Sequence, residues 1–119
     1  MSSGSIPTVY VQWETFLHWL LDRTEGFPKR LRFTLTSRID NRALDVFERL
    51  VEARYSRDKI NLLSAINRDL EILRLLLRIA HDRRALDHRA FDHATVQIDT
   101  TGRMIGGWLR QQRQRSNTR

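Results

Sequence analysis

The sequence predicts an all-α protein, an antiparallel up-down four-helix bundle, and three observations support this fold class. Neither glycine nor proline occurs between Lys29 and Thr101, so the residues that usually separate strands and hairpins are missing from most of the chain. Apolar residues recur at the spacing of an amphipathic helix. The chain has 119 residues, enough for one hydrophobic core and too few for two. We therefore expect one domain over residues 1–119, with flexible ends at 1–7 and 115–119.

The boundaries of the helices follow from the few residues that can interrupt a helix. Gly26 can end the first helix, and Pro28 can begin the second, because the first helical turn does not use the N–H group that proline lacks. Two polar breaks contain Asp58 and Asp87, which can accept unpaired backbone N–H groups at a helix start. The helices are expected at about 8–23, 29–55, 59–83 and 88–114. Connections this short favour antiparallel neighbours.

Each predicted helix has an apolar face at roughly 100° per residue. The third helix has more apolar surface than one stripe requires, and we expect its additional residues to form a subunit interface. The same breadth would arise if this helix were simply the most central one. The expected core residues are Tyr10, Trp13, Phe16, Leu17, Leu20 and Leu21; Ile39, Ala43, Val46, Phe47, Leu50 and Ala53; Leu63, Ile66, Leu70, Leu73 and Leu77; and Phe91, Ala94, Ile98, Ile105, Trp108 and Leu109. The expected interface residues are Ile72, Leu75, Leu76 and Ile79.

The charge of the chain favours polyanionic partners. Lysine and arginine together number 21 against 14 acidic residues, which gives a net charge of +7. Only Lys29 and Lys59 are lysines, and the arginine excess suits phosphate binding and base stacking, although GC-rich codon usage would also produce it. The absence of cysteine excludes disulfides, and the start of the chain resembles neither a signal peptide nor an anchor. We expect a cytoplasmic protein without a membrane partner.

The candidate phosphate contacts come from three groups of basic residues. One group follows Pro28, a second forms a stripe on the second helix opposite its core face, and a third lies on the fourth helix away from the core. Neighbouring acidic side chains offset part of this charge, and any single arginine could instead be solvated and paired at i,i+4. The three groups are Lys29, Arg30 and Arg32; Arg38, Arg42 and Arg49; and Arg89, Arg103 and Arg110.

One spacing offers an enzymatic alternative. Arg83 and His88 match an R-x4-H pattern that is reminiscent of the HEPN family of all-helical ribonucleases, in which arginine would stabilise phosphate charge and histidine would act as general acid or base. The match spans a predicted turn, and arginine is so common here that chance produces it. His88 and His93 lie roughly 140° apart on a helix and are unsuited to one metal ion. We expect no enzyme activity, no cofactor and no metal.

Two segments carry a resemblance to a known family. Residues 27–39 read FPKRLRFTLTSRI, and residues 102–109 read GRMIGGWL. Together with the long helices between them, they resemble the accessory variability (Avd) proteins of diversity-generating retroelements. Bundle proteins encoded in ribosomal-RNA intervening sequences share a similar first segment, whereas the second segment is closer to Avd.

The resemblance implies a barrel-like homopentamer of four-helix bundles whose basic surface binds template RNA, and possibly DNA, and associates with the element's reverse transcriptase. Such a protein supports error-prone cDNA synthesis and performs no chemistry itself. The basic residues named above would then contact phosphates or the reverse transcriptase. The alternative resemblance implies a structural or interaction protein of the intervening-sequence type.

Overall fold

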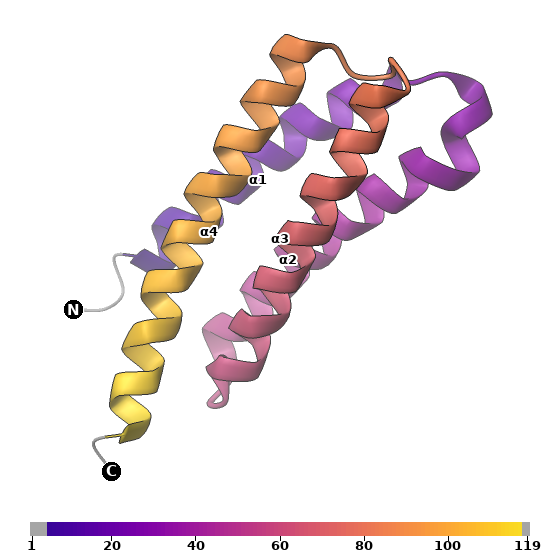
Figure 1. The fold of residues 1–119 in the computed structure, drawn as a ribbon. Helices are drawn as coiled ribbons and strands as arrows, with labels where there is room; N and C mark the ends of the chain where they lie inside the picture. The colour runs from indigo at the N-terminus through magenta and orange to yellow at the C-terminus, as the bar shows by residue number, and fades with distance from the viewer. Residues whose placement is uncertain (1–4, 118–119) are drawn as a thin grey trace.

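A computed structural model describes residues 5–117 and folds this part of the chain into helices without any strand (Figure 1). This result confirms the predicted all-α class with four long helices. The helices are α1 (Ser5–Glu25), α2 (Ser37–Tyr55), α3 (Lys59–Asp82) and α4 (His88–Asn117). Residues 1–4 and 118–119 of the predicted flexible ends lie outside the described residues, and 5–7 and 115–117 belong to α1 and α4.

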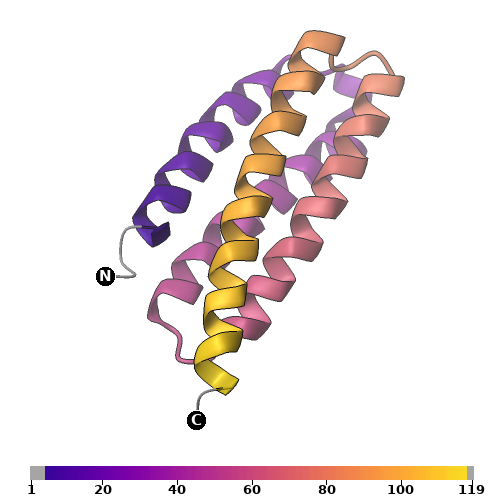
Figure 2. The same ribbon diagram turned by 60° about the vertical axis from the view of Figure 1, so that its left-hand side comes forward.

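The four helices pack in a ring in which each helix contacts two others. α1 packs against α2 and α4, and α3 packs against the same two helices. Figures 1 and 2 show the α3–α4 turn at the end of the bundle where α1 passes to α2, and the α2–α3 connection at the opposite end. The bundle is about 52 Å long and 19–24 Å across. Within residues 5–117, no helix is both long enough and apolar enough to cross a membrane.

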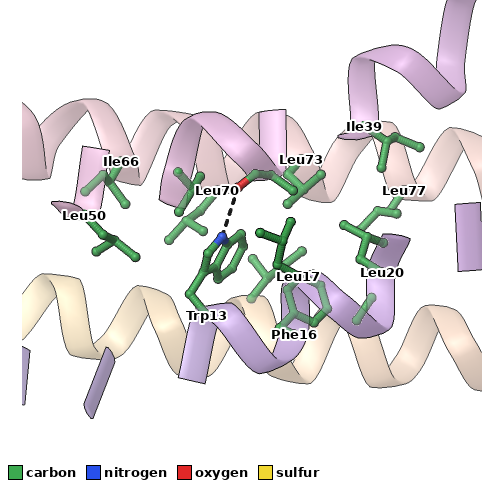
Figure 3. Close-up of a cluster of buried hydrophobic side chains, with 14 of the residues drawn as sticks. Trp13, Phe16, Leu17, Leu20, Ile39, Leu50, Ile66, Leu70, Leu73 and Leu77 are labelled. Atoms are coloured by element: carbon green, nitrogen blue, oxygen red, sulfur yellow. Dashed lines mark hydrogen bonds between the residues drawn. The ribbon is translucent and has the colours of Figure 1, made fainter. Parts of the chain in front are cut away.

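The core lies where the apolar faces of all four helices meet (Figure 3). Trp13 is fully buried at its centre, and its indole N–H donates a hydrogen bond to the backbone oxygen of Ala43 at 3.0 Å. This bond joins α1 to α2 and gives the buried polar atom a partner. Nearly all predicted core positions are buried, while Tyr10 and Phe47 pack ring against ring at the edge of the core, 5.1 Å between centroids.

The connector between α1 and α2 differs from the prediction. Helix was expected from residue 29, but Lys29–Leu31 form a 3₁₀ turn, Arg32–Thr36 form a π-helical turn, and α2 begins only at Ser37. The backbone N–H of Ser37 donates to the oxygen of Arg32, five residues earlier. The periodicity of apolar residues predicts a helical rise, but it does not specify which carbonyl accepts each N–H bond. One continuous helix was therefore expected where a 3₁₀ turn, a π-helical turn and an α-helix follow one another.

The two other connections use different capping groups. Asp87 behaves as expected, since its carboxylate accepts the N–H of Ala90 at 2.8 Å. Asp58 occupies the expected N-cap position of α3, but its side chain accepts a bond from the amide of Asn61 and none from the backbone of α3. The ammonium of Lys59 instead donates to the oxygens of Ala53 and Ser56, at 2.6 and 2.7 Å, and so caps the end of α2.

Arg84 holds the turn between α3 and α4 in a left-handed conformation, with φ of 63°. The backbone N–H groups of Ala85 and Leu86, which follow Arg84, both donate to the backbone oxygen of Ala80 in the last turn of α3. Leu86 is buried and thereby ties the turn to the core. Glycine is the usual residue at such a position because it has no Cβ to clash.

Candidate nucleic-acid interface

The nine predicted basic residues are distributed over separate parts of the surface. Lys29, Arg30 and Arg32 lie in the connector, Arg42 and Arg49 of the second group lie at the α2–α3 contact, and Arg103 and Arg110 line a groove beside α3. Arg89 lies at the other end of α4 from Arg110. The structure therefore gathers parts of each predicted group and does not join them into a single stripe.

The connector cluster, defined as Lys29, Arg30 and Arg32, is the most accessible group. All three side chains are exposed, and within residues 5–117 no salt bridge ties any of them to a carboxylate. The 3₁₀ and π turns present them at the end of the bundle shown at the upper right of Figure 1. Their charge is therefore available to a partner in solution.

A pocket of about 700 Å³ opens beside the connector cluster. Lys29, Arg32 and Phe33 line one part of it, and polar side chains from the first turns of α2 line another. At the end of the π turn, the hydroxyl oxygen of Thr36 is buried without a hydrogen-bond partner in the described structure. An unpaired buried hydroxyl costs free energy relative to a paired one, and this oxygen is too buried to meet a molecule in the pocket directly.

Asp40 forms the inner wall of the same pocket. Its carboxylate accepts a hydrogen bond of 2.7 Å from the hydroxyl of Thr24, a buried residue at the end of α1. Burial raises the pKa of Asp40 above its ordinary value, and the bond from Thr24 offsets only part of this effect. Together with the exposed Glu25, Asp40 adds acidic groups to the pocket that Lys29 and Arg32 also line.

The α2 stripe was expected opposite the core, and this expectation is wrong for two of its three arginines. The guanidinium of Arg42 pairs with one carboxylate oxygen of Asp69 at 2.9 Å, and Arg49 pairs with the other. Asp69 lies on α3 and is almost fully buried, whereas each arginine keeps about a third of its side chain exposed. The pair therefore flanks the core and joins α2 to α3, while Arg38 is exposed.

The Asp69 cluster, defined as Asp69 with Arg42 and Arg49, has a net charge of +1 by the charges of its side chains. Because a carboxylate fixes both guanidinium groups, their remaining N–H groups are held in place at the surface. This arrangement can bind a phosphate, but with less positive charge than three free arginines would provide.

A second basic groove, of about 490 Å³, lies between α3 and α4. Arg74, Arg103 and Arg110 line its sides, and Gly102 and Gly106 form its floor. Arg74 pairs with Asp99 across the groove, so one of the three charges is offset. A Cβ placed at either glycine would meet no atom closer than 3.6 Å, so packing inside the subunit leaves space above them.

Arg89 lies apart from the other arginines of α4. It lines a small pocket that also contains Trp19 and His93, whose rings lie 4.5 Å apart. The guanidinium group of Arg23 lies over the ring of Trp19, 5.2 Å from its centroid. Arg89 thus belongs to a cationic and aromatic surface at the α3–α4 turn.

The predicted interface residues on α3 form a partly exposed apolar face. Ile72, Leu75 and Ile79 are 38%, 47% and 46% exposed, whereas Leu76 is half-buried and packs against the core of its own subunit. The helix is thus not simply the most central one, because its additional leucines and isoleucines reach solvent. The structure describes one subunit, and the partner of this face stays a prediction.

The R-x4-H spacing places its two residues on either side of the α3–α4 turn. Arg83 is exposed after the end of α3, and His88 is the first residue of α4, with its Nε2 atom 3.3 Å from the carboxylate of Asp92. Neither residue lines the pockets described above. Within residues 5–117, no group of three histidine or acidic side chains is placed to hold a metal ion.

Three residues of the candidate sites, Asp69, Arg74 and Phe33, were not identified from the sequence. The burial of Asp69 could have been inferred from the sequence, because Asp69 lies three residues after Ile66 and four before Leu73, both buried on the core face. An acidic residue in such a register requires a cationic partner from a neighbouring helix. Arg74 could be found only from its contact with α4, and Phe33 only from the π turn that leaves it exposed.

Comparison with known proteins gives one match. A family model described as bAvd-like matches residues 8–112, which span nearly all of the four helices. No curated protein and no solved structure matches the chain.

Proposed function

The chain belongs to the bAvd-like family, and on this premise we propose that it is the accessory protein of a diversity-generating retroelement. It binds the template RNA and the reverse transcriptase in the cytoplasm and supports mutagenic cDNA synthesis without chemistry of its own. The match over residues 8–112 is the observation that carries the proposal, and it confirms the resemblance seen in the two sequence segments.

The proposed nucleic-acid surface is centred on the connector cluster. Its three cations are exposed and unopposed by any described salt bridge, whereas two of the arginines on α2 already share Asp69. Arg103 and Arg110 add a second contact region along the groove of α4. Phosphate contacts at these places would release counterions, so binding should weaken steeply as salt rises.

The proposed assembly is a homopentamer of up-down bundles arranged as a barrel. Its support within the subunit is the partly exposed apolar face of Ile72, Leu75 and Ile79, which a neighbouring copy would cover. Substitution of Leu75 by glutamate would place a charge in that contact. We expect this variant to lose the pentamer and keep its helical content, as measured by light scattering and circular dichroism.

The test is co-purification with a cognate reverse transcriptase and its template RNA, with the mass of the assembly measured on the same sample. A variant with alanine at all three connector positions should bind RNA more weakly and with a shallower salt dependence, by about 0.7–0.9 in the slope for each lost phosphate contact.

The matched control removes three exposed arginines outside the proposed surface, Arg57, Arg68 and Arg78. Its net charge is the same as that of the connector variant, so a purely long-range effect of charge would weaken both equally. Equal binding by the two variants would reject the connector as the binding region. Failure to form any complex with the reverse transcriptase would favour a structural role of the intervening-sequence type.

A further inference from the structure

Phe33 has an exposure that the fold does not require. It is 87% exposed, more than any other large apolar side chain of the described residues. The neighbouring apolar residues of the connector, Phe27 and Leu35, are buried instead. Phe33 lies in the π turn directly after Arg32, and irregular turns of this kind often occur at functional sites.

The surroundings of Phe33 combine three kinds of chemistry. Lys29 and Arg32 provide positive charge on the rim of the 700 Å³ pocket that Phe33 also lines. Ser37 and Asn41 also line the pocket and supply hydrogen-bond donors and acceptors. An aromatic ring, cations and hydrogen-bonding groups are the elements with which proteins hold single-stranded nucleic acids.

We propose that Phe33 and this pocket bind one unpaired base of a single-stranded nucleic acid. The base stacks on the ring of Phe33, Lys29 and Arg32 contact the phosphates on either side, and the polar wall of the pocket meets the edge of the base. This inference rests on the proposed function, since it specifies how the same protein holds its nucleic acid.

The acidic residues of the pocket favour a base over a phosphate beside them. Glu25 and the partly buried Asp40 line the pocket, and their carboxylates would repel a phosphate but can accept hydrogen bonds from the amino groups of a base. A protein partner fits less well, because lysine and acidic side chains are depleted in the centre of protein interfaces, and Lys29, Glu25 and Asp40 line the same pocket as Phe33.

The experiment compares two single strands of about eight nucleotides, one with normal bases and one with abasic sugars of the same charge. Both are prepared as RNA and as DNA, and their affinities are measured by fluorescence anisotropy for the wild type and for Phe33→Ala, Phe33→Leu and Phe33→Trp. Phe33→Ala should bind the normal strand roughly five- to one-hundred-fold more weakly and the abasic strand unchanged. Phe33→Trp should restore binding, and its fluorescence should be quenched by the normal strand, whereas Phe33→Leu should not restore it.

Tyr55 provides a matched control, because it is 77% exposed at the opposite end of α2 and its ring is covered by Arg54 of the same helix, 5.7 Å away. Tyr55→Ala should leave both affinities unchanged, and a loss equal to that of Phe33→Ala would overturn the assignment. If the wild type binds both strands equally and Phe33→Ala matches it, the base site is wrong while phosphate binding stands. If the wild type binds neither strand, the proposed nucleic-acid function fails as well. A change of oligomer mass in Phe33→Ala, with unchanged affinity, would identify the ring as a protein contact.

Discussion

Replacement of Arg42 and Arg49 by methionine should destabilise the fold strongly, because it leaves Asp69 without either cation. The side chain of Asp69 is only 5% exposed, so water cannot replace the lost partners without disrupting the contact between α2 and α3. Removing the partners of a buried charge costs about 3–5 kcal/mol. Methionine keeps a long apolar stem over the core, so the loss reports mainly on the carboxylate.

The opposite substitution should be milder. Asp69→Leu leaves the two guanidinium groups unpaired, but each is about a third exposed and can turn to water. We expect a loss of about 1–3 kcal/mol, the range for hydrogen bonds to charged groups. The triple variant, with methionine at both arginines and leucine at Asp69, should return to within about 1 kcal/mol of the wild type, because no charge then remains buried.

The measurement is urea unfolding followed by circular dichroism at one fixed protein concentration, since any oligomer makes stability depend on concentration. Methionine at Arg68 and Arg78, two exposed arginines of α3, serves as the control and should change the free energy of unfolding by less than about 0.5 kcal/mol. A loss below about 1 kcal/mol in the variant that keeps Asp69, or no recovery in the triple variant, would refute the role of this cluster.

Three further predictions concern single positions. Burial raises the pKa of Asp40, so the folded protein binds the carboxyl proton more tightly than the unfolded chain does. The stability that this proton contributes is complete below the pKa of the unfolded chain, about 3.8, and is lost as pH rises through the pKa of the folded state. Asp40→Asn should therefore gain stability relative to the wild type between about pH 3.5 and 7, and urea unfolding that shows a constant difference over this range would contradict the assignment. Arg84→Gly should raise the free energy of unfolding by about 0.5–1 kcal/mol, because the strain that glycine removes from the left-handed backbone exceeds the entropy that glycine adds to the unfolded chain. Thermal unfolding checks this, and a lower melting temperature would show that the arginine side chain stabilises the turn. Purified protein should leave RNA intact on prolonged incubation, whereas cleavage that disappears in His88→Ala would establish the ribonuclease alternative.

The helices and their buried faces were predictable because both depend on local spacing. Trp13, Ile39 and Ile98 occupy the core as their periodicity indicated, and three of the four helix starts lie within three residues of the expected positions. The start of α2 was not predictable in this way. The connector is held by a π turn, whose bonding pattern leaves no trace in the spacing of apolar residues.

The candidate surface was less predictable because its properties depend on contacts between helices. The angular position of Arg42 and Arg49 could be estimated from the sequence, but their pairing required knowledge that Asp69 of α3 lies opposite them. The connector cluster was identified from its charge alone, and its accessibility followed from the structure. The pocket beside it combines residues from α1, the connector and α2, so it could not be inferred from one helical face.

The two lysines of the chain differ in a way that has a practical use. The ammonium of Lys59 is held by carbonyl oxygens at the end of α2, whereas that of Lys29 is exposed in the connector. Reagents that acylate amines need an accessible side-chain nitrogen, so we expect Lys29 to react much faster than Lys59. Among the lysine side chains, a single position can thus receive a dye or a cross-linker. The rate of that labelling with and without a ligand would report directly on occupancy of the pocket beside it.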